Sequence, residues 1–289
     1  MTASKGRLHA VLADLDAEGE QLSAWVLPLA PAQWAALTPA EGWTIGHQIA
    51  HLCWTDEVSL IAATDPDALR GVVARAMGDP TGFVDAAAEE LAAVAPEDLL
   101  ARWARSRAAL SQALHAVPGG TEIPWFGPPM SATSMATARL METWAHAHDV
   151  AEALGIAPEP SSRAKHVAYL GVRTRDFAYQ VRGKTPPDAE FRVELTGPDG
   201  DLWAWGPKDA AERVTGSGHD FALLATRRRH VSDVDVKADG DDASYWLTIV
   251  QAFAGLPGND PRSRGSDPQP RGNDPQPRGN DPQPRGSAA

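Results

Sequence analysis

Apolar side chains recur at every third or fourth position through most of the first 158 residues, which is the spacing of amphipathic helices. Together with start and stop signals, this spacing predicts four helices, over residues 5–27, 44–63, 85–116 and 131–155. Thr44 is a suitable N-cap for the second helix, "TDPD" ends it, and "APED" interrupts the third. Four such helices predict an antiparallel bundle.

The pattern changes from about residue 160. A helix over 162–182 is followed by "FRVELTGPDGDLWAW", in which two alternating runs flank a GPDG turn and so predict a β-hairpin. A strand, a helix, a second strand and a closing helix are expected after it. The predicted fold class is therefore mainly α, with a bundle over 1–158 and a small α+β domain over 160–257.

The end of the chain has a different composition. From Asn259 it consists of "NDPRSRG", "SDPQPRG" and two copies of "NDPQPRG", followed by "SAA". These units contain Pro, Gly and opposite charges but no apolar side chain to bury, and the heptad period cannot form a coiled coil with polar residues or Pro at its core positions. We expect residues 258–289 to be a disordered tail.

Composition limits the kinds of partner. The formal net charge of −12 argues against nucleic acid, which is bound through clustered Lys and Arg. The single cysteine, Cys53, excludes an internal disulfide framework and is expected to be a small core residue. The N-terminus has no apolar signal segment, and no apolar run is long enough to cross a membrane. We expect a cytoplasmic protein with no membrane partner.

Candidate metal ligands gather in "METWAHAHDV", residues 141–150. On a helix, Glu142 and His146 lie one turn apart on the same face, where they are close enough to share an ion. His148 points away from that face, whereas Asp149 returns to it. Two protein ligands are too few for a catalytic zinc ion, which needs three and an open position.

The second helix supplies the missing donor, because His47 and His51 lie four residues apart in "WTIGHQIAHLCW". Facing helices of a bundle bring their side chains together in its core. A mononuclear site of one acid and two imidazoles suits zinc, although nickel, cobalt or iron accept the same donors. The alternative is that these are ordinary hydrogen-bonded histidines and a solvated Glu–His pair.

The same stretches resemble a known family. "GWTIGHQIAHLCW" and "SATSMATARLMETWAHAHDV" are similar to the two signatures of the DinB-like bundle of mycothiol-dependent maleylpyruvate isomerases. The resemblance implies a divalent metal, normally zinc, bound by His51, Glu142 and His146. His47 and Asp149 would then orient the ligands, and His47 has the alternative role of a fourth ligand that closes the site.

The C-terminal segment "VTGSGHDFALLATRRRHVSDVDVKADG" resembles the sterol-carrier-like second domain of that family. This resemblance implies a substrate-binding arginine, which "TRRRH" places at Arg228. The ending "WLTIVQAFAG" is typical of a subgroup of uncharacterised metal-binding proteins. The same portion also resembles a short domain named after wyosine base formation in tRNA.

Taken together, the residues and the resemblance predict a metal-dependent enzyme that uses a small thiol, such as mycothiol. It would be an S-transferase or isomerase acting on a small electrophilic substrate. Trp125, in the loop "PWFGPPM", is a candidate pocket wall. The alternatives are a non-catalytic protein that binds a metal or small ligand, a partner-binding module, and a tRNA wyosine-related protein.

Overall fold

The computed structural model describes residues 2–80, 82–253, 255 and 261–263. Most of the tail predicted from the heptad repeat lies outside these residues. Among the described residues, no helix has the length and apolarity needed to cross a membrane.

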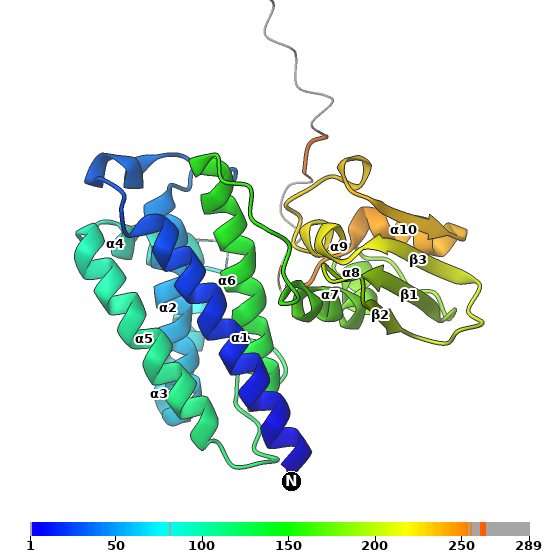
Figure 1. Ribbon diagram of the computed structural model, residues 1–289. Helices are drawn as coiled ribbons and strands as arrows, with labels where there is room; N and C mark the ends of the chain where they lie inside the picture. The colour runs from blue at the N-terminus through cyan, green and yellow to red at the C-terminus, as the bar shows by residue number, and fades with distance from the viewer. Residues whose placement is uncertain (1, 81, 254, 256–260, 264–289) are drawn as a thin grey trace, which may run out of the picture.

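Four long helices form the bundle that the periodicity predicts (Figure 1). They are α1 (Thr2–Val26), α2 (Ile45–Thr64), α5 (Pro96–Ala116) and α6 (Ala132–Leu154). Helix α2 packs against α5 and α6, and α1 packs against α6. The short helices η1 (Pro31–Ala35), α3 (Pro66–Gly78) and α4 (Phe83–Ala92) complete this part of the chain.

Helix α3 is absent from the sequence-based prediction. "TDPD" was expected to stop the second helix, and it does, but the same residues start another one. The Asp65 side chain accepts a hydrogen bond from the backbone N–H of Ala68 at 3.0 Å, and Pro66 occupies the first helical turn. A capping Asp followed by Pro is a start signal as well as a stop signal, because Pro fits the first turn of a helix.

The two helices that carry the candidate ligands have well-defined ends. Thr44 caps α2, as predicted, by accepting a hydrogen bond from the backbone N–H of His47. Ser131 caps α6 through the N–H of Ser134 at 3.1 Å, and α6 ends at Gly155, whose φ of 67° is left-handed. These caps fix where each helix begins and ends, and hence the height of its side chains in the bundle.

The C-terminal part forms the predicted α+β arrangement, with the predicted helix 162–182 divided at Thr174 into α7 and α8. The four-stranded sheet has the order β2-β1-β3-β4, in which only β1 and β3 are parallel. The remaining elements are α7 (Ala164–Arg173), α8 (Arg175–Gln180), β1 (Phe191–Thr196), β2 (Leu202–Trp205), β3 (Glu212–Ser217), α9 (Gly218–Ala225), η2 (Val231–Asp233), β4 (Val236–Asp239) and α10 (Asp241–Ile249).

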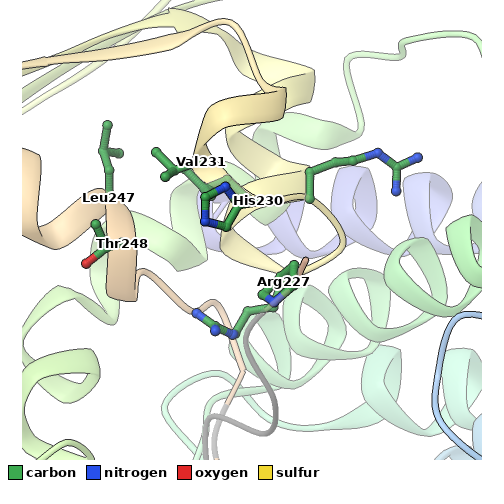
Figure 2. A pocket seen from close by; sticks show the side chains of 8 residues that line it. Arg227, His230, Val231, Leu247 and Thr248 are labelled. Atoms are coloured by element: carbon green, nitrogen blue, oxygen red, sulfur yellow. The ribbon is translucent and has the colours of Figure 1, made fainter. Parts of the chain in front are cut away.

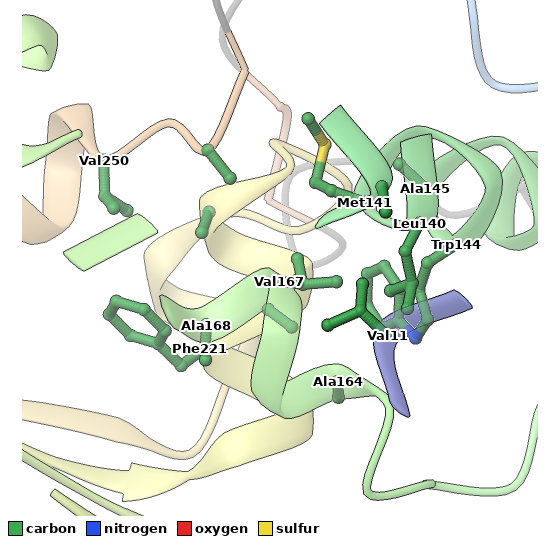
Figure 3. Close-up of a cluster of buried hydrophobic side chains, with 14 of the residues drawn as sticks. Val11, Leu140, Met141, Trp144, Ala145, Ala164, Val167, Ala168, Phe221 and Val250 are labelled. Carbon is green, nitrogen blue, oxygen red and sulfur yellow. The ribbon is translucent and has the colours of Figure 1, made fainter. Parts of the chain in front are cut away.

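One of the two hydrophobic clusters of the bundle continues into the α+β part. Trp144 of α6 and Val11 of α1 lie in the same buried cluster as Val167 of α7 and Phe221 of α9 (Figure 3). Polar contacts flank this seam, among them the hydrogen bond between His166 and Asp14 at 2.8 Å. The predicted division near residue 159 therefore falls between parts that are packed together.

Candidate metal centre

Three of the predicted ligands converge between α2 and α6. His51 comes from α2, and Glu142 and His146 come from α6. One donor atom of each lies within 4.8 Å of the other two. The Glu142 Oε2 atom is 3.3 Å from His146 Nε2 and 3.5 Å from His51 Nε2. Both imidazoles are buried, while the glutamate side chain is 26% exposed, so the cluster has one side open to solvent.

The electrostatics of this cluster favour a carboxylate at Glu142 beside a neutral His146. Burial alone would raise the pKa of Glu142, but hydrogen bonds and charge interactions with His146 and His51 outweigh it and hold the pKa well below its usual value. Burial lowers the pKa of His146 to about 4. The site therefore presents the deprotonated forms that metal ions bind.

Aromatic rings surround the imidazoles. The Trp43 indole is stacked on His146, with ring centroids 5.9 Å apart and planes at 19°, and its centroid lies 5.3 Å from that of His51. Its Nε1–H donates to Asp85 at 3.1 Å, which ties the indole to α4. On another side, the ring of Trp54 lies 6.2 Å from that of His51. Trp43 immediately precedes Thr44, the N-cap of α2.

His47 lies outside the cluster. Its Nε2 is 2.7 Å from the Glu89 carboxylate of α4, and its Nδ1 is 2.8 Å from the Thr44 hydroxyl. Both ring nitrogens are thus engaged at the start of α2. These contacts do not connect His47 to the three ligands, so they give no support to the prediction that His47 orients or completes the site.

Asp149 and Arg228 form an ion pair beside the cluster. Asp149 Oδ2 is 3.9 Å from His146 Nδ1, beyond hydrogen-bond distance but close enough for an electrostatic interaction. Two nitrogens of the Arg228 guanidinium donate to the Asp149 carboxylate at 2.7 and 3.3 Å, and the third donates to the Thr226 carbonyl at 2.7 Å. A substrate carboxylate at Arg228 would have to displace one of these partners.

Trp125 stands at the far end of a run of aromatic rings. It contacts Phe126 at 5.1 Å between centroids, Phe126 lies 6.4 Å from Phe83, and Phe83 lies 5.3 Å from Trp54. Trp54 in turn contacts His51. Trp125, which was predicted as a pocket wall, is thus linked to the ligand cluster through these neighbouring rings and not by a direct contact.

Gln48 is the residue that sequence reasoning missed. It is fully buried on α2, and its Oε1 is in close contact with His146 Nδ1. Its Nε2 donates to the Thr38 hydroxyl at 2.8 Å. The sequence offered one signal for Gln48, its position three residues before His51, which places both on the same side of the helix. That spacing alone does not distinguish an orienting glutamine from any other polar helix residue.

A buried ion pair lies next to the cluster. Arg139 donates to the Asp56 carboxylate at 3.0 Å and to the Thr55 hydroxyl at 2.6 Å, and the indole N–H of Trp103 donates to Asp56 at 3.1 Å. Because Thr55 lies one turn after His51 and Arg139 lies three residues before Glu142, this network sets the position of α2 relative to α6 where the ligands face each other.

His148 does not join the ligands, as the helical geometry predicts. Its ring lies 3.8 Å from that of Trp144 and 5.5 Å from that of His219 on α9, and its Nδ1 is 2.7 Å from the Trp144 carbonyl. Burial lowers the pKa of His148 to about 3. This side chain belongs to the contact between the bundle and the α+β part.

A separate cavity of about 120 Å³ lies in the α+β part (Figure 2). Its walls include Arg227, His230 and Val231 after α9, and Leu247 and Thr248 on α10. None of the three candidate ligands lines it. The cavity is therefore distinct from the metal centre.

Cys53 is fully buried, as predicted. Burial, aided by the negative charge of Glu57, raises the pKa of its thiol to about 12. The thiol is protonated at neutral pH and is not a nucleophile in the folded chain.

Comparison with known proteins gives two matches to family models. Residues 15–151 match the mycothiol maleylpyruvate isomerase N-terminal domain, and residues 187–239 match the model described as wyosine base formation. The first covers the helices that carry His51, Glu142 and His146, and the second covers the sheet.

Whole-chain relatives are found in Mycobacterium tuberculosis. The uncharacterised proteins Rv0036c and MT0041 are each 57% identical over 247 residues, which cover 86% of this chain and 96% of the relative. Among solved structures, the mycothiol-dependent maleylpyruvate isomerase aligns with a TM-score of 0.56 at 17% identity, over 80% of this chain and 92% of that one. A histidine-to-alanine mutant of that enzyme aligns with a TM-score of 0.54 at 18% identity, with the same coverage. At these identities the two structures support the fold alone.

Proposed function

Because the chain belongs to the mycothiol maleylpyruvate isomerase N-terminal domain family, we propose that it is a divalent-metal-dependent enzyme that uses a small thiol. The reaction would be S-transfer to, or isomerisation of, a small electrophilic substrate. His51, Glu142 and His146 would hold the metal, with zinc as the expected ion. The observation that carries the proposal is the convergence of these three donor atoms.

The two distances between Glu142 and the imidazoles suit a tetrahedral zinc ion. With metal–ligand bonds of roughly 2.0–2.1 Å, two ligand atoms at tetrahedral angles lie about 3.3–3.4 Å apart. The Glu142 Oε2 atom is 3.3 Å from His146 Nε2 and 3.5 Å from His51 Nε2. Three protein donors leave one position for an exogenous ligand, which is the arrangement of catalytic rather than structural zinc sites.

The charges also suit a cation. His146 Nε2 lies 3.3 Å from the carboxylate oxygen of Glu142, and both atoms can donate an electron pair to the same ion. A divalent ion at this place would balance the negative charge of Glu142.

The thiol has to come from outside the chain, because the only cysteine is buried and protonated. A metal at this site would lower the pKa of a coordinated thiol and supply thiolate at neutral pH. The solved isomerase is named for mycothiol, and we propose mycothiol or a similar thiol as the cosubstrate here. For isomerisation, the thiolate would add to an activated C=C bond, whose π pair would move onto the neighbouring atoms and re-form the double bond when the thiolate leaves again. For S-transfer, the thiolate would displace a leaving group, which would depart with the pair of electrons of the bond that breaks.

The aromatic run beside His51 supports a small substrate with an apolar or planar portion. Trp54, Phe83 and Phe126 form its surface, and Phe126 is 41% exposed. Trp125 extends this surface. A substrate lying on these rings would have its electrophilic end directed toward the cluster and would exclude water from it.

Elemental analysis tests the ligand set. We expect about one divalent ion per chain in the purified protein. His51→Ala and His146→Ala should each lose most of it, because two remaining ligands are too few for tight binding. His47→Ala is the matched control: it removes a histidine of the same helix that bonds to Thr44 and Glu89, and it should keep the metal. Full metal content in both ligand variants would refute the assignment.

Cobalt substitution tests the thiol. We expect a thiolate-to-metal charge-transfer band when mycothiol is titrated into the cobalt-loaded protein, and no band in Glu142→Ala. S-methylated mycothiol, a thioether that cannot form a thiolate, serves as the control ligand. The absence of a band with every thiol tested would favour the alternative of a non-catalytic metal-binding protein.

A tRNA-directed role has one observation in its favour, the match of residues 187–239 to the wyosine base formation model. The formal net charge of −12 opposes it, since RNA binding depends on clustered positive charge. A filter-binding assay with tRNA, at low salt and at physiological ionic strength, separates a tRNA-directed role from the proposed metal-dependent enzyme. We expect no binding that survives physiological ionic strength.

A further inference from the structure

We propose that Gln48 is the positioning residue of this site: through Thr38 it fixes the tautomer of His146, so that Nδ1 carries the proton and Nε2 presents its lone pair to the metal. The inference rests on the proposed metal-binding function and adds a residue that no spacing or family signature singles out. It follows from the hydrogen-bond donors and acceptors between Trp43 and His146, which leave one consistent assignment for Nδ1.

The assignment begins at a backbone carbonyl. The Thr38 hydroxyl lies 2.9 Å from the carbonyl oxygen of Trp43, which can only accept, so the hydroxyl donates to it. The Thr38 oxygen then has only lone pairs left for its second partner, Gln48, at 2.8 Å. The amide NH₂ of Gln48 therefore faces Thr38, and its carbonyl oxygen faces His146.

The carbonyl oxygen of Gln48 is a pure acceptor, so His146 Nδ1 must carry the hydrogen that it accepts. Because that hydrogen occupies Nδ1, His146 can bind a metal only through the lone pair of Nε2. That atom is the one nearest Glu142 and His51. Metal-bound histidines are commonly held in this way by an acceptor on the other nitrogen.

Asp149 is the competing acceptor for the same nitrogen. Its Oδ2 lies 3.9 Å from His146 Nδ1, and its carboxylate is held by two nitrogens of Arg228. The Arg228 pair thus keeps the carboxylate at a distance and leaves the neutral amide as the partner. A neutral partner makes the imidazole a weaker electron donor than a carboxylate would, which leaves a bound metal more Lewis-acidic.

His51 has no equivalent device. Its Nδ1 is buried and makes no hydrogen bond within the part of the chain that the structure describes. Its ring is positioned instead by packing against Trp43 and Trp54. Of the two imidazoles, His146 is therefore the one whose Nδ1 is oriented by a hydrogen bond, and Gln48 is the partner in that bond.

Nitrogen-15 NMR of the metal-free protein with labelled histidines tests the tautomer directly. The His146 signals are identified by their loss in His146→Ala. We expect Nδ1 of the wild type to show the shift and proton coupling of a protonated nitrogen. Gln48→Met, which keeps the length of the side chain without an acceptor, should give a mixture of tautomers. Gln48→Glu should restore the Nδ1–H form.

Two further variants separate positioning from a general loss of packing. Thr38→Val should disturb the tautomer, whereas Thr38→Ser should preserve it, because only the hydroxyl fixes the amide. Gln251→Met is the matched control, since Gln251 is an equally buried glutamine of the α+β part that bonds to Phe253 and Arg182. It should leave the His146 signals unchanged even if it lowers the melting temperature.

Metal affinity, measured by competition with a chelator, gives the second measurement. Gln48→Met should weaken binding by about 10–100-fold, the usual effect of losing an orienting partner, and Gln251→Met should not. An Nε2–H tautomer in the wild type, or unchanged signals and affinity in Gln48→Met, would overturn the inference. A wild type with the expected tautomer but no affinity for any divalent ion would support the role of Gln48 and refute the proposed function instead.

Discussion

At the scale of single residues, Trp43 packs against two of the candidate ligands. Its indole covers His146 and His51 and is tied to α4 through Asp85. We expect Trp43→Ala to release the metal to a chelator roughly tenfold faster than the wild type, because the apolar shell of a metal site controls solvent access. Stopped-flow chelation measures the rate.

Asp85→Ala is the control for Trp43, since it removes the hydrogen bond that ties down the indole but leaves the ring in place. Its effect should be smaller than that of Trp43→Ala. Equal release rates in all three proteins would show that the indole does not cover the metal in solution.

Cys53 gives a second prediction at this scale. Because burial raises the pKa of its thiol to about 12, the folded protein should hold no thiolate up to pH 9. A disulfide reagent should therefore label Cys53 only after denaturant unfolds the chain. Cys53→Ala should cost about 1 kcal/mol, measured by urea unfolding, and leave metal content unchanged. Rapid labelling of the native protein would contradict this prediction.

The candidate ligands show which residues a sequence can reveal. Glu142 and His146 follow from the helical period alone, because residues four apart share a face. The choice of His51 over His47 needed the family signature, since both lie on the same helix. Gln48 could not be found from either, because its partner Thr38 lies in a loop whose path is set by tertiary structure.

At the scale of elements, the buried Asp56–Arg139 pair holds α2 against α6. Both side chains are only 4% exposed, so removing one partner leaves an uncompensated charge. We expect Asp56→Ala to lower the free energy of unfolding by about 3–5 kcal/mol. Because the pair lies close to the ligands, metal affinity should fall as well. Urea unfolding and chelator competition measure the two effects.

The double variant Asp56→Leu/Arg139→Met should recover much of that stability, because it removes both charges and fills the space with apolar atoms. Arg70→Ala is the control, since Arg70 forms an exposed pair with Asp67 and its loss should change the free energy of unfolding by less than about 0.5 kcal/mol. An Asp56→Ala protein as stable as Arg70→Ala would contradict the prediction.

Element boundaries were predicted where capping residues and periodicity agree, as at Thr44 and Gly155. Helix α3 was missed because its start signal overlaps the stop signal of α2. The division of the predicted helix 162–182 at Thr174 was also missed. Its hydroxyl bonds to the carbonyls of Leu170 and Gln251, the latter 77 residues away, which is a tertiary contact that no local pattern contains.

At the scale of the whole molecule, composition and periodicity indicated a bundle followed by an α+β part, but not that the two share a core. The predicted boundary near residue 159 falls in a short connection between α6 and α7, and the apolar residues on either side belong to one cluster (Figure 3). Ion pairs cross the same seam, including Arg228 with Asp149 and Arg229 with Glu152. A shared core makes the folding of each part depend on the other.

Val167 tests this dependence, because it is fully buried on α7 at the seam with α1 and α6. Truncation to Ala removes two methyl groups and leaves a cavity, so we expect Val167→Ala to cost about 2 kcal/mol. Since the core is continuous, calorimetry should show one unfolding transition that moves to lower temperature as a whole. Tyr169→Ala, at an exposed position of the same helix, should hardly shift it. Two transitions in the wild type, with only one sensitive to Val167→Ala, would instead mean that the bundle and the α+β part unfold independently.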